Sequence, residues 1–183
     1  MPVNSKTDMN IVTKFTIASH EGIETLSMLT RELAREKFSA LLETPVIDTY
    51  IDQYFNRKTL VDEINSMSNE WLTVYVNDHP AGYAKITSKG KAPLLLEHKR
   101  VVRIAEFGIL KKYPEHEVRN ALFEKCLSVC KRREGIWVNE YPESPVIDFF
   151  ESKGFLKQPE SCQLEELPLA SVCLVYINDA TKK

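Results

Sequence analysis

The sequence predicts a single α/β domain in which strands and helices alternate. Its 183 residues, 43% hydrophobic and 27% charged, match the size and composition of one globular domain with a substantial core. Stretches with apolar residues at every second position are interspersed with stretches in which they recur every three or four positions, as strands and helices require. No repeat, low-complexity segment or linker divides the chain. We therefore expect one domain over 1–183, with flexible tails at 1–10 and 179–183.

The first half is expected to form a strand, helices and a hairpin. Ser19 is a natural N-cap for a helix with apolar positions from Ile23 to Phe38. Asn77 to Ala81 are rich in turn residues and separate two apolar strand candidates, which predicts a hairpin. The expected elements are a strand at 11–18, the helix that follows Ser19, helical stretches at 46–55 and 59–67, and the strands 71–76 and 82–86.

The second half is expected to contain strands and two further helices. Acidic residues follow Pro114 and basic residues precede Gly135, as the dipole of an intervening helix favours. The expected elements are a polar loop at 88–100, a strand at 101–110, this helix, a strand at 136–138, a helix at 144–153 capped by Ser144, and strands from Phe155 that end with 170–177. The predicted order is β-α-α-β-β-β-α-β-α-β-β.

Composition excludes several classes of protein. The six glycines, at 22, 82, 90, 108, 135 and 154, are too widely spaced for a G-x-G-x-x-G fingerprint or a Walker phosphate loop. A net charge of −2 provides no general positive field for nucleic acid or an anionic membrane. The longest apolar runs are far shorter than the roughly 20 residues of a membrane span. We expect a cytoplasmic protein with neither nucleic acid nor membrane as a partner.

The cysteines and histidines do not predict a metal site. Cys126, Cys130, Cys162 and Cys173 form no C-x-x-C pair, and the four histidines lack ligand spacing relative to them. Free cysteines are among the most buried residue types. We expect reduced thiols in the core and no metal.

Three local sequences, in this order, carry a family resemblance. They are WLTVYVNDHPAGYAKI at 71–86, FGILKKYPEHEVRNALFE at 107–124 and FFESKGF at 149–155. Together they resemble the GCN5-related N-acetyltransferase family, which transfers acetyl groups from acetyl-CoA to amines. The resemblance spans about Phe15 to Ile177 and implies the acyl-CoA N-acyltransferase fold, a mixed, mostly antiparallel sheet of about seven strands flanked by helices.

The resemblance also implies where acetyl-CoA, as cosubstrate, would bind. A strand that separates from its neighbour pairs with the pantetheine arm, and the next helix presents its N-terminal N–H groups to the pyrophosphate. The implied strand is Phe107, Gly108, Ile109 and Leu110, and the implied turn is Glu115, His116, Glu117, Val118, Arg119 and Asn120, with Lys111 and Lys112 just before it.

The chain departs from the family pattern at three of these positions. Glu117 and Arg119 stand where the family has glycines that let the backbone approach phosphate. Phe150 stands beside the cofactor at a position where many members have a tyrosine that protonates the leaving thiolate. Arg119, Lys111 and Lys112 are either phosphate ligands or solvated surface charges. An alternative function is therefore a non-catalytic module that has lost normal CoA binding, and a third is transfer from another acyl donor.

Candidate catalytic and acceptor-binding residues lie before and between these motifs. A protonated amine cannot attack a thioester, so a base is needed, and Glu106 is the best candidate, with an ordinary strand glutamate as the alternative. Tyr141 is the candidate for a substitute proton donor, with Ser144 or water as alternatives. Acidic residues on the N-terminal helices suit a small-molecule amine acceptor but are also typical of a solvated face. The acceptor candidates are Glu32, Tyr50 and Tyr54, with Glu36 and Asp52 as further acidic residues. The apolar strand 170–177 leaves a homodimer open.

Overall fold

The structure is a computed structural model that describes residues 8–163 and 167–178, so the expected tails at 1–10 and 179–183 lie largely outside the described residues. The first half contains β1 (Ile11–Phe15), α1 (His20–Phe38), α2 (Thr44–Tyr54), α3 (Arg57–Asn65), β2 (Asn69–Val76) and β3 (His79–Thr87). The second half contains the 3-10 helix η1 (Leu94–Leu96), β4 (Val101–Ile109), α4 (His116–Cys130), β5 (Gly135–Glu140), α5 (Val146–Ser152), β6 (Leu156–Gln163) and β7 (Ala170–Ile177).

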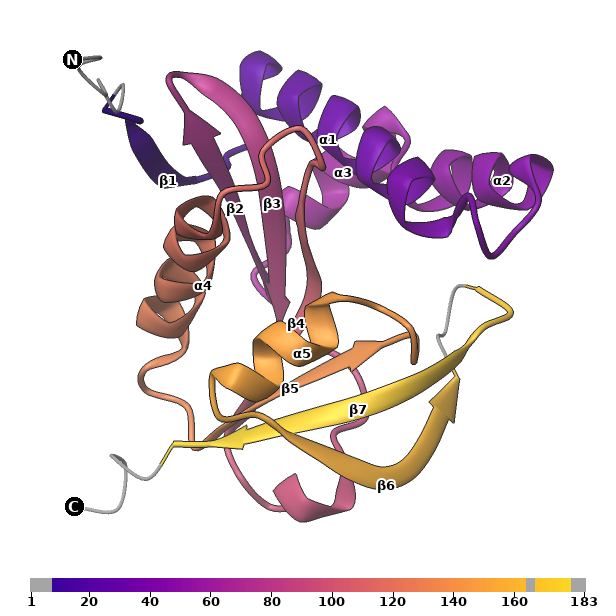
Figure 1. Ribbon diagram of the computed structural model, residues 1–183, viewed down its shortest axis with the longest axis vertical. Coiled ribbons are helices and arrows are strands. Elements are labelled where there is room, and N and C mark those ends of the chain that lie inside the picture. The colour runs from indigo at the N-terminus through magenta and orange to yellow at the C-terminus, as the bar shows by residue number, and fades with distance from the viewer. Residues whose placement is uncertain (1–7, 164–166, 179–183) are drawn as a thin grey trace, which may run out of the picture.

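The strands form one seven-stranded sheet in the order β1-β2-β3-β4-β5-β7-β6 (Figure 1). Every neighbouring pair is antiparallel except β4 and β5, which are parallel and connected through α4. A parallel pair needs such a crossover, because a hairpin reverses the direction of the chain. This is the acyl-CoA N-acyltransferase arrangement that the sequence predicts.

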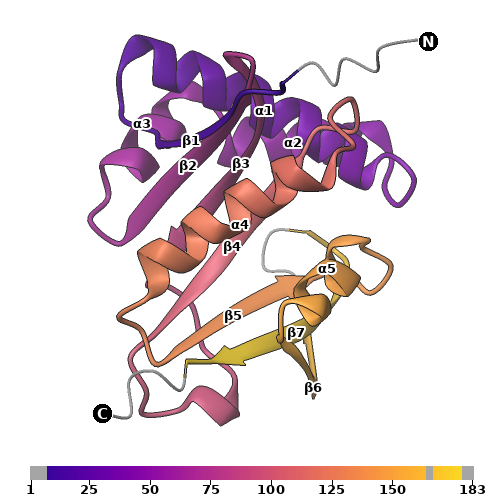
Figure 2. The same ribbon diagram turned by 60° about the vertical axis from the view of Figure 1, so that its left-hand side comes forward.

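Helices cover both faces of the sheet and bury two apolar clusters. On one face, α4 packs against β1 to β4 through Val118, Leu122 and Phe123, which lie in the larger cluster. On the other, α1 to α3 pack over β2 and β3, and Leu26 of α1 shares a cluster with Trp71 and Tyr83 (Figure 2). Burial on both faces explains why β2 and β3 are almost continuously apolar.

Local signals place several elements as predicted. The Ser19 side chain accepts a hydrogen bond from the Gly22 N–H, 3.0 Å away, and caps α1. Asn77 and Asp78 both have positive φ, and Val76 pairs with His79, so β2 and β3 are joined by a two-residue turn. Positive φ at both central residues gives the twist that a tight hairpin needs. The hairpin is therefore confirmed with longer strands than predicted.

Two details of the prediction are wrong. The predicted order counts the helical stretches 46–55 and 59–67 as one helix, but they form two, because Asn56 caps α3 and separates it from α2. The helix α4 ends at Cys130, so the basic residues that follow lie beyond its last turn. Ser144 lies one residue before the N-cap Pro145, and its hydroxyl oxygen accepts a hydrogen bond from the Val146 N–H at the start of α5, 3.3 Å away, as a capping residue does. The same hydroxyl donates to Glu140, 3.1 Å away.

The described cysteines lie in the core. Cys126, Cys130 and Cys173 are free and buried, and burial raises the pKa of the Cys130 thiol to about 12. The side chain of Cys162 lies outside the described residues. Within residues 8–163 and 167–178, no helix is long and apolar enough to cross a membrane.

Candidate active site

The strands β4 and β5 separate in the middle of the sheet. They pair only at Val101 with Gly135, Val102 with Ile136, and Arg103 with Trp137. Beyond this point β4 stays paired with β3 and β5 with β7, so the two strands diverge (Figure 2). Ala105 has no partner in β3, because Glu106 pairs with Lys85 and Ile104 with Ile86. Such a bulge bends a strand and increases its twist, and it lies where the separation begins.

The separation exposes one backbone edge of β4. The Leu110 N–H donates to the Ala81 carbonyl of β3, 2.8 Å away. Backbone groups alternate in direction along a strand, so those of Phe107 and Ile109 are directed away from β3, toward the gap. An extended ligand with its own amide groups can pair with this edge.

Three adjoining cavities lie around the gap. The outer cavity, about 370 Å³, lies between the end of α1, β4 and the segment from Tyr141 to Val146. The inner cavity, about 190 Å³, lies among α1 to α3 and β3 to β5. A narrow neck of about 30 Å³ lies beside Tyr83, Glu106 and Gly108. The outer cavity shares Phe107 and Gly108 with the neck, and the inner cavity shares Tyr50 and Glu106 with it.

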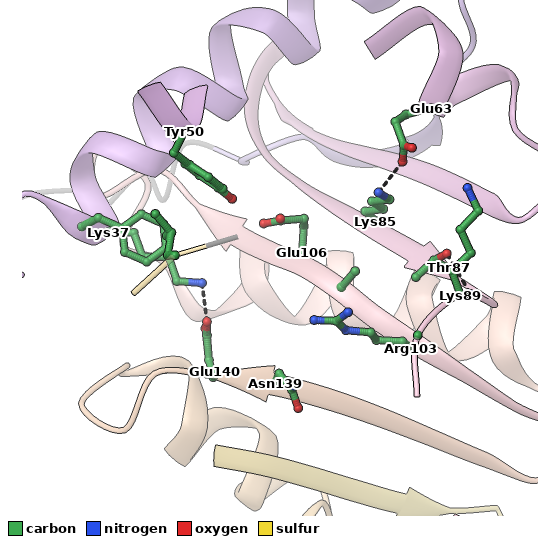
Figure 3. Close-up of a pocket in the computed structure, with 14 residues that line it drawn as sticks. Lys37, Tyr50, Glu63, Lys85, Thr87, Lys89, Arg103, Glu106, Asn139 and Glu140 are labelled. Carbon is green, nitrogen blue, oxygen red and sulfur yellow. Dashed lines mark hydrogen bonds and ion pairs between the residues drawn. The ribbon is translucent and has the colours of Figure 1, made fainter. Parts of the chain in front are cut away.

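Lys37 lines all three cavities. It extends from α1 to form an ion pair with Glu140 of β5 (Figure 3). Its Nζ also lies 5.5 Å from the ring centroid of Phe38 and 5.7 Å from that of Tyr141. Burial alone would lower the pKa of Lys37, but Glu140 and Glu106 raise it above its ordinary value. The gap therefore holds a fixed positive charge at neutral pH.

Glu106 lies beside Lys37, in the lining of both the neck and the inner cavity. The Tyr83 hydroxyl is directed at the Glu106 carboxylate with a long separation of 3.5 Å. Burial, and then Glu106, raise the pKa of Tyr83 well above its ordinary value, so the phenol keeps its proton and donates it to this contact.

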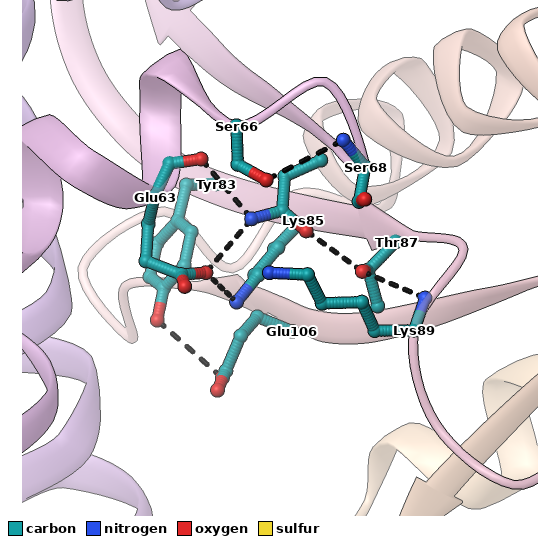
Figure 4. Close-up of polar contacts among 9 residues, drawn as sticks. Glu63, Ser66, Ser68, Tyr83, Lys85, Thr87, Lys89 and Glu106 are labelled. Atoms are coloured by element: carbon teal, nitrogen blue, oxygen red, sulfur yellow. Dashed lines mark hydrogen bonds and ion pairs between the residues drawn. The ribbon is translucent and has the colours of Figure 1, made fainter.

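A polar network lies at the end of the inner cavity that is opposite to Lys37 (Figure 4). Glu63 of α3 forms an ion pair with Lys85 and accepts a hydrogen bond of 2.8 Å from Asn69. The Thr87 hydroxyl donates a hydrogen bond to the side-chain oxygen of Asn69 at 2.7 Å and accepts one from the backbone N–H of Lys89 at 3.1 Å. Burial alone would raise the pKa of Glu63, but Lys85 lowers it, so this carboxylate is ionised.

The structure gathers part of the predicted cofactor set around the outer cavity. Phe107, Gly108, Ile109, Lys111 and Arg119 line it, and the Arg119 guanidinium lies 5.5 Å from the centroid of the Phe149 ring. The others do not line it: Leu110, Val118 and Phe150 are fully buried, Asn120 is half-buried, and Lys112, Glu115, His116 and Glu117 are exposed outside it. Phe150 packs among phenylalanines, 5.0 Å from Phe155, so its side chain offers no surface to a ligand.

Of the other predicted residues, Glu106, Tyr50 and Tyr141 line the cavities, the last of them the outer one. Burial, and then Glu140, raise the pKa of Tyr141 although Lys37 opposes the shift, so its hydroxyl is protonated at neutral pH. Tyr54 packs beside Tyr50 with ring centroids 5.4 Å apart and lines none of the three cavities.

Of the three acidic residues predicted to lie near the acceptor, Glu36 lines the outer cavity. Glu32 and Asp52 are exposed, because each lies on the outer side of its helix, and neither lines the three cavities. Glu36 accepts a hydrogen bond from the Lys111 N–H at 3.0 Å and ties α1 to the loop after β4.

Sequence reasoning missed Lys37 and Glu140. They are 103 positions apart, and no local pattern relates them. One signal was present, because Lys37 lies four positions after Leu33 in α1 and therefore on one helix face with it. A lysine beside a leucine on one face indicates a charge set in an apolar surface.

Comparison with known proteins defines the fold. No protein-family model matches the sequence. PaiA N-acetyltransferase from Thermoplasma acidophilum, solved with coenzyme A, aligns with a TM-score of 0.74 and 12% identity over 92% of this chain and 99% of that one. A GNAT-family acetyltransferase from Staphylococcus aureus aligns with a TM-score of 0.64 and 13% identity over 93% of this chain and 99% of that one. Arabidopsis thaliana Naa50 in complex with a bisubstrate analogue aligns with a TM-score of 0.59 and 16% identity over 91% of this chain and 97% of that one. The chain has the fold of the GCN5-related N-acetyltransferases.

We predict that Lys37→Met weakens the fold in a pH-dependent way. The substitution leaves the Glu140 charge, 6% exposed, without its cation and should lower the free energy of unfolding by about 2 kcal/mol, less than for a fully buried pair. Because the pKa of Lys37 is raised in the folded state, its contribution is complete below about 10.4 and is lost as the pH rises through the folded value. Urea unfolding from pH 7 to 11 measures the difference between the two proteins.

The control is Lys58→Met at an exposed position of α3, which should change little at any pH. A difference for Lys37→Met that is absent at pH 7, or that does not shrink at the alkaline end, would contradict the structural role of the pair.

Proposed function

We propose that this protein is a member of the GCN5-related N-acetyltransferase family that moves an acetyl group from acetyl-CoA to the amine of a small molecule. The observation that carries the proposal is the meeting of an outer and an inner cavity at Lys37, where β4 and β5 separate. Two cavities joined by a neck can receive a donor and an acceptor from opposite sides. Two solved structures of the same fold are complexes with coenzyme A or with a CoA bisubstrate analogue, which supports an acyl-CoA donor.

The residues of the outer cavity fit coenzyme A. The peptide-like pantetheine arm can pair with the open backbone edge at Phe107 and Ile109, which would replace the missing β5 partner. Lys111 and Arg119 line the same cavity and can hold the pyrophosphate by charge-assisted hydrogen bonds. The side chain of Glu115, the N-cap residue of α4, makes no capping hydrogen bond, so it does not occupy the first N–H groups of the helix. In this chain the charge of Arg119 would hold the pyrophosphate in place of the close backbone contact that glycines allow in the family.

Acetyl-CoA, when bound, supplies a thioester carbonyl, and the groups around the neck supply the rest. Glu106 would take the proton from the acceptor ammonium, because only the neutral amine is a nucleophile. The Tyr83 hydroxyl holds one oxygen of Glu106 and so orients the carboxylate. Lys37 would place its positive charge where negative charge gathers during attack, an electrostatic role that is strong in a site with little water. On the side of the outer cavity, the Tyr141 hydroxyl would donate a proton to the leaving thiolate of CoA.

The alternative is a binding module that has lost ordinary CoA affinity. Its support is the acidic start of α4, where Glu115 and Glu117 are exposed and would repel a pyrophosphate near the helix N-terminus. The two functions differ in one property, the affinity for CoA, which a binding isotherm measures directly.

We predict that the protein binds CoA and that Arg119→Glu weakens this binding by about ten- to a hundredfold. This is the loss expected when a charged hydrogen bond to an anion is replaced by repulsion. Isothermal titration calorimetry with CoA checks it. Arg132→Glu, the same change at an exposed position beyond the other end of α4, is the matched control and should retain wild-type affinity. Equal affinities in both variants would remove Arg119 from the site, and no binding to the unaltered protein would favour the binding module.

We predict that Glu106→Gln lowers kcat by a factor of about 10² to 10⁴, the usual range for loss of a general base. The variant should recover part of its rate as the pH rises, because more of the acceptor is then already deprotonated. Steady-state thiol release from acetyl-CoA between pH 6 and 10 measures this. Glu97→Gln, at an exposed position after η1, should leave the rate unchanged. A pH profile parallel to that of the unaltered protein would contradict a proton-removing role.

A further inference from the structure

The inner cavity is divided by charge along its length. Figure 3 shows Lys37, Tyr50 and Glu140 on one side of Glu106, and Thr87, Lys89 and Arg103 on the other. The first side adjoins the neck and the outer cavity. An acceptor that reacts at the neck must therefore extend the remainder of its structure toward the second side.

The second side of the cavity is basic. Three cations line it, Lys85, Lys89 and Arg103, against one described carboxylate, that of Glu63. Glu63 already forms an ion pair with Lys85 and accepts a hydrogen bond from Asn69. Over the whole cavity the described lining residues include four cations and three carboxylates, and Lys85, Lys89 and Arg103 place most of the positive charge on this side.

Packing holds this basic end in place. Arg103 is only 7% exposed, and its guanidinium lies 4.8 Å from the centroid of the Trp137 ring. Gly90 ends the cavity with φ of +105°, and a Cβ there would come within 3.2 Å of the same ring. A cation buried at the end of a shaped cavity favours an anionic ligand, because its charge is poorly screened by water.

The reacting end of the cavity offers groups for an amine. Glu106 lies there, and the side-chain oxygen of Asn139 is buried without a hydrogen-bond partner in the described part of the chain. An N–H group of the substrate amine can donate a hydrogen bond to this oxygen. Such a bond is favourable, because a buried oxygen without a hydrogen-bond donor is costly. Arg103 and Glu106 are three positions apart along β4, and the bulge at Ala105 between them lets both line this cavity, with at most roughly 10 Å of strand between them at about 3.3 Å per residue. Their side chains can thus contact opposite ends of one small molecule.

We propose that the acceptor is a small primary amine that also carries a carboxylate or phosphate, with the amine at Glu106 and the anionic group at Lys89 and Arg103. This assignment rests on the acetyltransferase function proposed above. The cavity volume of about 190 Å³ corresponds to roughly six waters at about 30 Å³ each, which suits a molecule of amino-acid size. A diamine of the same length would place its second positive charge against Lys89 and Arg103.

A matched amine series tests this proposal. The acceptors are ω-amino acids from glycine to 5-aminopentanoate, alkylamines and diamines of the same chain lengths, and phosphoethanolamine beside ethanolamine. We expect kcat/KM with acetyl-CoA to be at least tenfold higher for the best amino acid or for phosphoethanolamine than for its uncharged or diamine counterpart. Comparison of the ω-amino acids with phosphoethanolamine shows whether the site prefers a carboxylate or a phosphate. An equal or higher value for the diamines would overturn the proposal.

Charge reversal at one lysine localises the effect. Lys89→Glu should lower kcat/KM for the preferred anionic amine at least tenfold. It should also lower the ratio of this kcat/KM to that of the diamine of the same length. Lys91→Glu makes the same change two residues away at an exposed position outside the cavity and should retain the preference. An equal loss in both variants would indicate a general field effect and would contradict a specific anion site.

A binding measurement separates this proposal from the function on which it rests. Calorimetric titration of the protein with the same amines, without acetyl-CoA, should show tighter binding of the anionic amines, and Lys89→Glu should weaken it. If no amine is acetylated and CoA does not bind, the acetyltransferase function fails, while this titration still reports on the charge preference. If acetylation occurs with no preference for anionic amines, only the assignment of the acceptor fails.

Discussion

β4 and β5 share only three residue pairs before they separate, and each feature of the site follows from that short pairing. The bulge at Ala105 turns β4 away, so its edge at Phe107 and Ile109 has no neighbouring strand. A sheet interior normally satisfies these backbone groups, and leaving them open is costly unless water or a ligand pairs with them. The gap thus provides a place for an extended ligand beside the neck between the outer and the inner cavity.

The ion pair of Lys37 and Glu140 spans this gap and connects α1 to β5. Charges of this kind seldom increase stability by much, because removing them from water costs about as much as their attraction returns. Their location at the junction of three cavities gives them a different use, a fixed positive charge beside Glu106. The aromatic rings of Phe38 and Tyr141 flank the lysine and limit its movement. In the proposed function, stability and chemistry would therefore depend on the same pair.

Sequence patterns predicted the parts of the fold that depend on neighbours in the chain. The Ser19 cap, the β2–β3 hairpin and the strand–helix unit of β4 and α4 follow from periodicity and turn residues. Glu106 and Tyr50 were found because their strand and helix were placed correctly. Lys37 and Glu140 were not, because their meeting depends on how α1 crosses the sheet. Glu32 was misplaced for the same reason, since the side of α1 that faces the sheet is settled by packing. The charged residues of the inner cavity come from five elements, α1, α3, β3, β4 and β5, and from the loop after β3, so their arrangement has no local signature.

The backbone edge of β4 is the most direct test of this account, through amide hydrogen exchange followed by NMR with and without CoA. Without ligand, the Phe107 and Ile109 amides should exchange faster than those of Gly108 and Leu110, which face β3. With CoA, Phe107 and Ile109 should become protected by tenfold or more, while Val101 to Arg103 stay unchanged, because they are already paired with β5. If CoA leaves the exchange of Phe107 and Ile109 unchanged, the gap between β4 and β5 is not the donor site.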